Sequence, residues 1–237
     1  MQIDTTYNFQ KDTQPLDADR YSPILQEYHR ILWNKPLPNG EIFTLTKISR
    51  NRLYHKSYLG EFYLSSDRAI TTYVKYQNTK NVISQLPNDK LKDFINLTET
   101  IGAITIWPSN KVDRKPTING AKGFEKKISD RLDLTIECIR RYYLGEDSPL
   151  FDTLKKYDNF FKLFNNFQGY IDFFLFNNYL NADYSVVKIA PPFDNFNSIP
   201  IPTTPEEYLS YMEHATNLVV ARNQLIAKRV KQGMYYG

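Results

Sequence analysis

Cysteine is almost absent from this sequence: Cys138 is the only one in 237 residues. A single thiol excludes an internal disulfide and indicates a reducing compartment, and we interpret it as an inert core residue. Long apolar runs are also missing, since residues 170–176 are interrupted by Asp172 and a membrane helix needs about 20 apolar positions. Residues 1–7 lack the basic and apolar pattern of a signal peptide. We therefore expect a cytoplasmic protein without membrane contact.

The common motifs of catalysis and phosphate binding are absent as well. No segment reads Gly-x-x-x-x-Gly-Lys-Ser/Thr, Gly-x-Gly-x-x-Gly or Gly-x-Ser-x-Gly. The three histidines, His29, His55 and His214, stand far apart and are accompanied by no cysteine pair. The sequence therefore predicts no metal site and indicates no particular cofactor.

The composition is that of a folded globular chain, with 41% hydrophobic and 24% charged residues. Tyrosine (18) and phenylalanine (15) are abundant, and we interpret them mainly as packing residues, because aromatic area serves a core as well as a ligand. The length suits one hydrophobic core. Residues 1–21 show no periodicity. We expect them to form an extended arm, followed by one globular domain over residues 22–237.

Strand patterns lie in the first half of the chain and most helical patterns in the second. A capping residue followed by proline marks helix starts at Ser22-Pro23 and Thr204-Pro205, and the second helix should reach about Lys231. Other expected helices cover residues 89–100, 130–144, 149–168 and 170–180. Expected strands cover residues 41–48, 61–64, 68–76, 103–107 and 185–189, with a loop over 109–127. This distribution predicts an α+β fold, a mostly antiparallel sheet from the first half covered by helices from the second.

Basic charge is gathered in two segments, although the net charge is only +4. Residues 110–141 hold nine basic and five acidic side chains, and residues 222–237 hold four basic side chains and no acidic one. The remainder of the chain is therefore net acidic. Such segregation favours a phosphate-bearing partner, for example a nucleotide or a nucleic acid.

Residues 117–123 form a glycine-bracketed segment inside the first basic region. Glycines let backbone amides approach an anion, and the start of the following helix adds partial positive charge. Gly120-Ala-Lys-Gly123 also matches the Gly-x-x-Gly pattern with which KH domains clamp a nucleotide backbone. The alternative is a solvated basic loop that ends in an ordinary helix cap. The phosphate interpretation predicts a site made of Asn119, Gly120, Lys122, Gly123 and Arg131, with Arg140 and Arg141 as further candidates.

Two carboxylates, Asp133 and Glu137, share one face of the helix expected over residues 130–144. They could act as acid and base in catalysis, or form a row of ion pairs with neighbouring arginines. Asp172 lies in an apolar run and needs a partner if it is buried; Arg131 or Arg140 would make it structural. Whether the protein is an enzyme stays open at this point.

Three segments resemble a family of uncharacterised bacterial proteins: residues 22–40, residues 130–143, and Gly169-Tyr-Ile-Asp-Phe-Phe174. The resemblance spans most of the chain and implies no assigned reaction, cofactor or catalytic residue. It associates the chain with mobile-element or phage-defence biology. Three functions remain open. The first is a binder of a phosphate-bearing ligand, the second is a protein-interaction module such as an inhibitor or antitoxin-like partner, and the third is a metal-independent hydrolase or transferase that uses the paired carboxylates.

Overall fold

Helices and two antiparallel sheets make up the computed structural model, which describes residues 3–48, 52–110, 114–189 and 193–232. The elements, with short 3-10 helices written η, are η1 (Phe9–Asp12), α1 (Ala18–Tyr21), α2 (Pro23–Trp33), β1 (Lys35–Pro36), β2 (Ile42–Phe43), β3 (Thr46–Ile48), β4 (Arg52–Ser57), β5 (Gly60–Arg68), η3 (Gln77–Thr79), α3 (Lys80–Ile83), α4 (Asn88–Thr98), η4 (Ile101–Ala103), β6 (Ile104–Pro108), α5 (Ile118–Phe124), α6 (Leu132–Leu144), α7 (Phe151–Lys155), α8 (Asp158–Lys162), α9 (Phe167–Phe174), η5 (Asn177–Tyr179) and α10 (Pro205–Lys231).

The main sheet has the strand order β3-β4-β5-β6, and each strand is antiparallel to its neighbour. Gly60 has a φ of 134°, a conformation that other residues rarely adopt, and it makes the tight turn between β4 and β5. The end of β5 pairs with β6, which places Asp67 opposite Thr105. Strands β1 and β2 form a separate small sheet. The predicted α+β fold, with a sheet from the first half and helices from the second, is confirmed.

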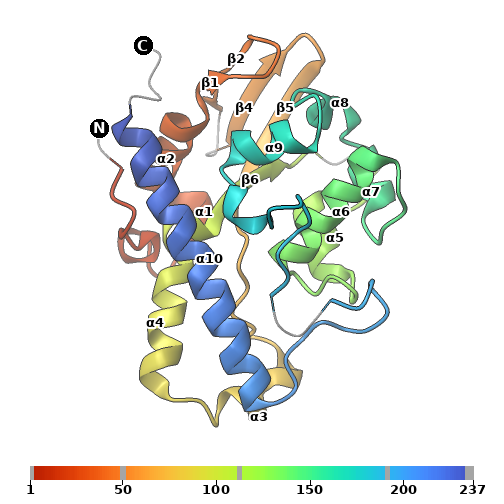
Figure 1. Ribbon diagram of the computed structural model, residues 1–237. Coiled ribbons are helices and arrows are strands. Elements are labelled where there is room, and N and C mark those ends of the chain that lie inside the picture. Colours follow the sequence, from red (N-terminus) through yellow and green to blue (C-terminus); the bar gives the residue numbers. More distant parts are fainter. Residues whose placement is uncertain (1–2, 49–51, 111–113, 190–192, 233–237) are drawn as a thin grey trace.

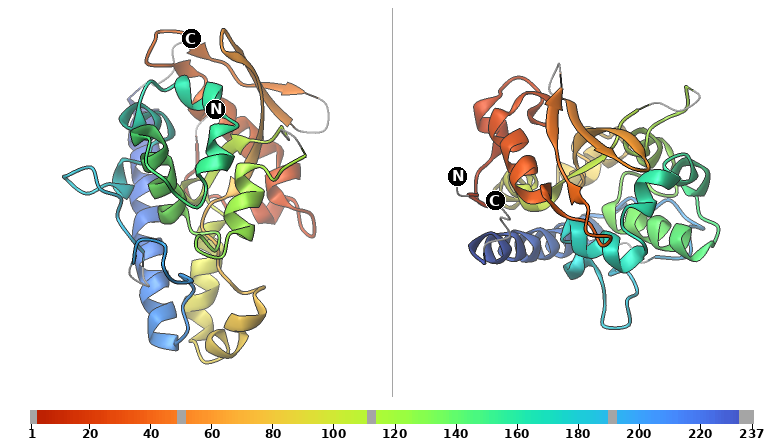
Figure 2. Two further views of the ribbon diagram at one scale, coloured as in Figure 1. Left: turned by 90° about the vertical axis from the view of Figure 1, so that its right-hand side faces the viewer. Right: turned by 90° about the horizontal axis from the view of Figure 1, so that it is seen from above.

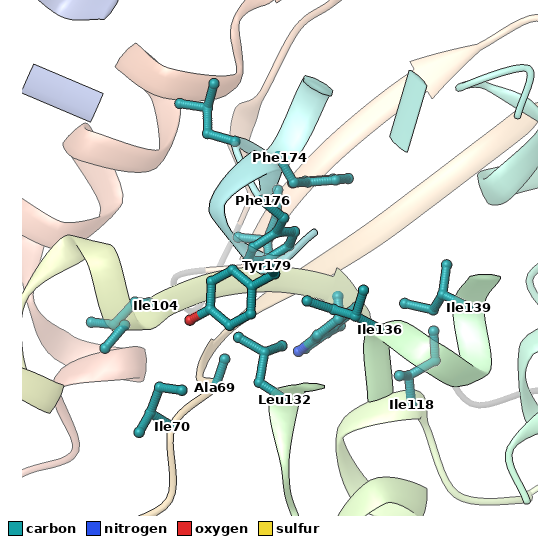
Figure 3. Close-up of a cluster of buried hydrophobic side chains, with 14 of the residues drawn as sticks. Ala69, Ile70, Ile104, Ile118, Leu132, Ile136, Ile139, Phe174, Phe176 and Tyr179 are labelled. Atoms are coloured by element: carbon teal, nitrogen blue, oxygen red, sulfur yellow. The ribbon is translucent and has the colours of Figure 1, made fainter. Parts of the chain in front are cut away.

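The sheet lies between α1 and α2 on one side and the helices of the second half on the other (Figures 1 and 2). Helix α10 runs the length of the molecule, with α3 and α4 beside its N-terminal half (Figure 1). Aromatic contacts join the layers: Phe62 of β5 meets Phe160 of α8 at 5.7 Å between ring centroids. Figure 3 shows how Ile104, Leu132 and Phe174, from β6, α6 and α9, meet in one buried cluster.

The helix ends follow the sequence signals closely. The hydroxyl oxygen of Ser22 accepts a hydrogen bond from the Leu25 amide at 3.1 Å, and Thr204 caps α10 in the same way through Glu207. Gly145 ends α6 in the left-handed conformation, with a φ of 70°. The expected helix over 89–100 and the expected strand over 103–107 are confirmed as α4 and β6.

Several local predictions were wrong. The first residues do not form an extended arm: they contain η1 and α1, and Phe9 is fully buried. Of residues 68–76, which were expected to form a strand, only Arg68 does so, as the last residue of β5. Strand β4 lies in a stretch expected to be a loop. The strand expected over 185–189 is a single bridge between Leu180 and Val186. In each case the sequence pattern was too short to show which partner the segment packs against.

One buried arginine links α10 to the rest of the fold. The side chain of Arg222 is fully buried, and its guanidinium donates to the carbonyl oxygens of Gly102, Ile104, Phe174 and Leu175 at 2.9 to 3.2 Å. The same group lies 4.2 Å from the ring centroid of Phe176. Burial lowers the pKa of Arg222 to about 10, so it stays charged at neutral pH. One side chain thus satisfies carbonyl groups at η4, β6 and the end of α9.

Replacing Arg222 should destabilise the whole fold. We expect Arg222→Met to lower the free energy of unfolding by about 3 kcal/mol, because four buried carbonyl groups lose a charged donor. Urea denaturation followed by circular dichroism measures this. Arg229→Met, at an exposed position of the same helix, is the matched control and should unfold close to the wild-type midpoint. Equal midpoints for the two variants would contradict this role of Arg222.

Candidate functional site

A groove of about 1000 Å³ lies between the N-terminal segment and the chain that follows β5. Side chains within residues 10–19 form one wall, and Arg68 with residues 70–76 forms another. Ile95, Glu99 and Asp130 complete the lining. The segment predicted to be an extended arm is therefore one wall of the groove.

Asp19 of α1 is the most unusual ionisable group in the groove. Its Oδ1 accepts a hydrogen bond from the Ser66 hydroxyl at 2.9 Å, and its Oδ2 accepts one from the Arg68 amide at 3.2 Å. Burial raises the pKa of Asp19 to about 7, and the nearby negative charge of Asp67 adds to the effect. Asp19 is therefore a carboxyl group that exchanges its proton much closer to neutral pH than an ordinary aspartate.

A chain of hydrogen bonds behind Asp19 fixes its orientation. The Trp33 indole N–H donates to Nδ1 of His29 at 3.1 Å, and Nε2 of His29 lies 2.9 Å from the Ser66 hydroxyl. Because an indole N–H can only donate, Nδ1 accepts and Nε2 of the neutral ring carries the proton. Burial lowers the pKa of His29 to about 3, so the ring remains neutral. Each hydrogen bond in this series is thus donated in the direction of Asp19.

A buried lysine joins two further carboxylates beside Asp19. Lys122 of α5 is 1% exposed; its ammonium group lies 3.1 Å from an oxygen of Asp67 and also contacts Asp130. The Trp107 indole N–H donates to the same Asp67 oxygen at 2.8 Å. Burial opposes the charge on Lys122, but Asp67 and Asp130 outweigh it and raise the pKa of the lysine. Lys122 therefore stays protonated. Its ammonium group lies between the buried carboxylate of Asp67 and the carboxylate of Asp130, which lines the groove.

The backbone is strained at two positions that line the groove. Tyr73 has a φ of 54° and Asp130 a φ of 61°, both in the left-handed region that bulky residues avoid. Two tyrosine hydroxyls anchor the segments next to these positions. That of Tyr211 donates to the Thr71 carbonyl at 2.7 Å, and that of Tyr73 donates to the Ser129 carbonyl at 3.0 Å. Strained residues kept by their surroundings often lie at functional sites.

Arg131, a central residue of the phosphate site predicted from the sequence, points into the interior. It is 1% exposed and forms a two-point ion pair with Asp133, at 3.0 and 2.6 Å. Its guanidinium also donates to the carbonyl oxygens of Ile189 and Pro200. Asp133 is fully buried and accepts a further bond from the Ile189 amide. The pair joins the start of α6 to two distant segments.

Glu137, the other catalytic candidate from the sequence, is surrounded by three cations. Its oxygens lie 2.9 to 3.0 Å from nitrogens of Arg140, Arg141 and Lys188. Burial opposes ionisation, but the hydrogen bonds from Arg140 and Lys188 are stronger and lower the pKa of Glu137 to about 2. Glu137 therefore stays ionised at all moderate pH values, which is unsuited to exchange of a proton.

The segment predicted as a glycine turn is helical. Asn119, Gly120 and Gly123 belong to α5, which Thr117 caps. The pairing suggested for Asp172 with Arg131 or Arg140 was wrong. Asp172 is exposed and accepts hydrogen bonds from Gln168 and Asn177. These residues thus do not converge on one anion site, and Lys122 faces Asp67 and Asp130 instead.

Cys138 lies on the buried side of α6 and is fully enclosed. Burial raises the pKa of its thiol to about 12. A thiol with so little thiolate is a poor nucleophile, as expected from its apolar neighbours in the sequence.

The fold and the groove define an α+β protein with a carboxyl-rich site built around Asp19. A family of unknown function (DUF6994) matches residues 3–226, and the chain belongs to this family. Neither a curated protein nor a solved structure matches the chain. In the described ranges, no helix combines the length and apolar character needed to cross a membrane. The same ranges hold no group of three His, Cys, Asp or Glu residues placed to bind a metal ion.

The raised pKa of Asp19 should make stability depend on pH in a particular direction. Folding binds a proton at Asp19 between about pH 4 and pH 7, so this residue lowers the free energy of unfolding as the pH rises through that window. We expect the stability of Asp19→Asn relative to the wild type to increase as the pH rises from about 4 to about 7. Urea denaturation at several pH values measures the difference. Glu213→Gln, at an exposed position of α10, is the control and should run parallel to the wild type.

Proposed function

We propose that the protein is an enzyme that uses Asp19 as a general acid or base on a polar small molecule in the groove. The observation that carries the proposal is the placement of this carboxyl group, whose pKa is about 7, on the lining of a groove of about 1000 Å³. A group that titrates near neutral pH both donates and accepts a proton readily. The hydrogen bonds from Ser66 and from the Arg68 amide hold it in one orientation.

Asp130 is the proposed partner of Asp19. Burial and the nearby charge of Asp67 raise the pKa of Asp130, and the adjacent Lys122 ammonium offsets this only in part. At Asp19 the charge of Asp67 also favours the protonated form, and the opposing cation, Arg68, has a weaker influence than Asp67. Two carboxyl groups in different electrostatic surroundings can divide the acid and base roles of a hydrolase or transferase. The proposal thus keeps a carboxylate-pair mechanism and assigns it to different residues from Asp133 and Glu137.

The charge of the groove indicates the class of substrate. Asp17, Asp19, Glu99 and Asp130 line it, against the two basic side chains of Arg68 and Lys75. Arg68 is already paired with Glu99 at 2.8 Å. An anionic substrate would be repelled, whereas an uncharged or cationic one is favoured. Amide and hydroxyl groups of Gln10, Gln14, Thr71 and Thr72 suit a molecule rich in hydroxyl or amino groups.

The test is turnover of small molecules from a cell extract. The extract is incubated with wild-type protein, Asp19→Asn, Asp130→Asn and the control Glu213→Gln, and mass spectrometry follows the compounds consumed. We expect the wild type and the control to consume the same compound, with a rate that changes near pH 7. Asp19→Asn should slow the reaction by about a hundredfold or more. Equal consumption by Asp19→Asn and the wild type would refute the proposed role, as would an unchanged extract.

We propose binding of a phosphate-bearing ligand, such as a nucleic acid, as a second candidate function. The observation that favours it is a hollow of about 430 Å³ that is lined by Lys127 and Arg141 together with Asn195 and Asn197. Both cations come from the basic segment 110–141. Arg141 is oriented by Asn195 at 2.5 Å and lies over the Phe196 ring at 5.0 Å. Glu125 and Asp147 also line this hollow, which limits its affinity for anions.

Lys127 allows a clean test of the second candidate because it is exposed, whereas Lys122 and Arg131 neutralise carboxylates inside the fold. We expect Lys127→Gln to weaken binding to a mixed-sequence single-stranded DNA and to reduce the slope of log affinity against log salt by about one. Fluorescence anisotropy at several salt concentrations measures both. Lys92→Gln on α4, also exposed, is the control. Identical slopes for the two variants would exclude this hollow as the binding site.

A further inference from the structure

A second hollow, of about 480 Å³, lies between β1 and α9 and shares no lining residue with the groove. Its apolar side includes Phe164 and Phe173. Its polar side includes Gln168 and Asp172, and the side-chain amide of Gln168 donates a hydrogen bond to the Asp172 carboxylate at 2.9 Å. The other polar atom of that side chain, the Gln168 amide oxygen, is buried and has no partner within the described residues. The hollow therefore places the exposed carboxylate of Asp172 beside an aromatic wall.

Lys35 of β1 brings a primary amine to this hollow. Its Nζ donates a hydrogen bond to the Phe173 carbonyl oxygen. The same nitrogen lies 4.5 Å from the ring centroid of Phe173 and 5.1 Å from that of Trp33. The amine is thus held by a neutral carbonyl group and two aromatic rings, and these replace much of the water that an ammonium group needs.

Burial and most of the charged groups around Lys35 oppose its protonation. Burial lowers the pKa of Lys35 to about 7, and the positive charges of Arg229 and Arg222 on α10 lower it further. Asp172 of α9 acts in the opposite direction. Burial and these two cations thus favour the unprotonated amine, the form that attacks carbonyl carbons.

We propose that Lys35 forms a reversible imine with an aldehyde or ketone that binds in this hollow. The lone pair of Nζ adds to the carbonyl carbon, and one proton passes from the nitrogen to the former carbonyl oxygen to give a neutral carbinolamine. The nitrogen then releases its remaining proton, the hydroxyl group takes up a proton and leaves as water, and a C=N bond forms. No oxidant or reductant takes part. The aromatic wall suits a flat or apolar body, and the exposed carboxylate of Asp172 accepts a hydrogen bond from a hydroxyl or amino group on it.

Reductive trapping tests this proposal directly. The protein is incubated with pyridoxal and sodium cyanoborohydride from pH 5 to pH 10, and peptide mass spectrometry locates and quantifies the secondary amine at each lysine. Exposed Lys92 serves as an internal reference in every sample. We expect Lys35 to be labelled at least about tenfold more than Lys92 at pH 7, since far more of its amine is unprotonated there. Labelling of Lys35 at or below the level of Lys92 at pH 7 would overturn the proposal.

Two variants separate a reactive site from a merely accessible lysine. Arg229→Gln removes an exposed cation that disfavours protonation of Lys35, so its labelling at pH 7 should fall while labelling at pH 10 is retained. Asp172→Asn removes the opposing charge and should shift the labelling curve to lower pH. Curves that do not move in either variant would show that these charges do not tune Lys35. The two proposals can fail separately. Labelling of Lys35 together with full activity of Asp19→Asn would support this site and refute the groove, whereas an unlabelled Lys35 together with a slow Asp19→Asn would do the opposite.

Discussion

The guanidinium of Arg222 is the contact on which the arrangement of the other elements depends. It donates to carbonyl groups of η4, β6 and the end of α9, and so fixes α10 against both the sheet and the helices of the second half. The position of α10 in turn determines where Tyr211 meets the Thr71 carbonyl. That bond holds the chain segment that lines the groove opposite Asp19. A buried charge that does not line the groove thus helps to shape it.

Charge inside this protein is balanced locally. Lys122 lies between Asp67 and Asp130, Arg131 is matched by Asp133, and Glu137 is surrounded by three cations. Burying an ion is costly unless a partner and hydrogen bonds compensate it, so each of these groups constrains the geometry of its neighbours. Much of the basic excess of residues 110–141 therefore serves the scaffold. Asp19 differs from these groups because its neighbour Asp67 is of the same sign, and its proton becomes the one that is easily exchanged.

Elements with local signals could be predicted from the sequence, whereas the groove could not. Ser22-Pro23, Thr204-Pro205 and Gly145 mark helix ends through contacts within one turn, and the structure confirms them. The groove brings together α1, the end of β5, α4 and Asp130, and no local pattern records that meeting. Asp17-Ala-Asp19 was the available signal, but it lies in a stretch without periodicity. The basic residues misled the interpretation because sequence gives their number and not the direction in which Lys122 and Arg131 point.

The enclosed thiol of Cys138 has a practical consequence. Reagents that alkylate or oxidise cysteine reach it only when α6 separates from the elements packed on it, since both the closed packing and the raised pKa protect it. As this is the sole sulfhydryl group of the chain, its modification rate reports the opening of that part of the core without any added label. Cys138 is thus an intrinsic probe of local unfolding in the native state.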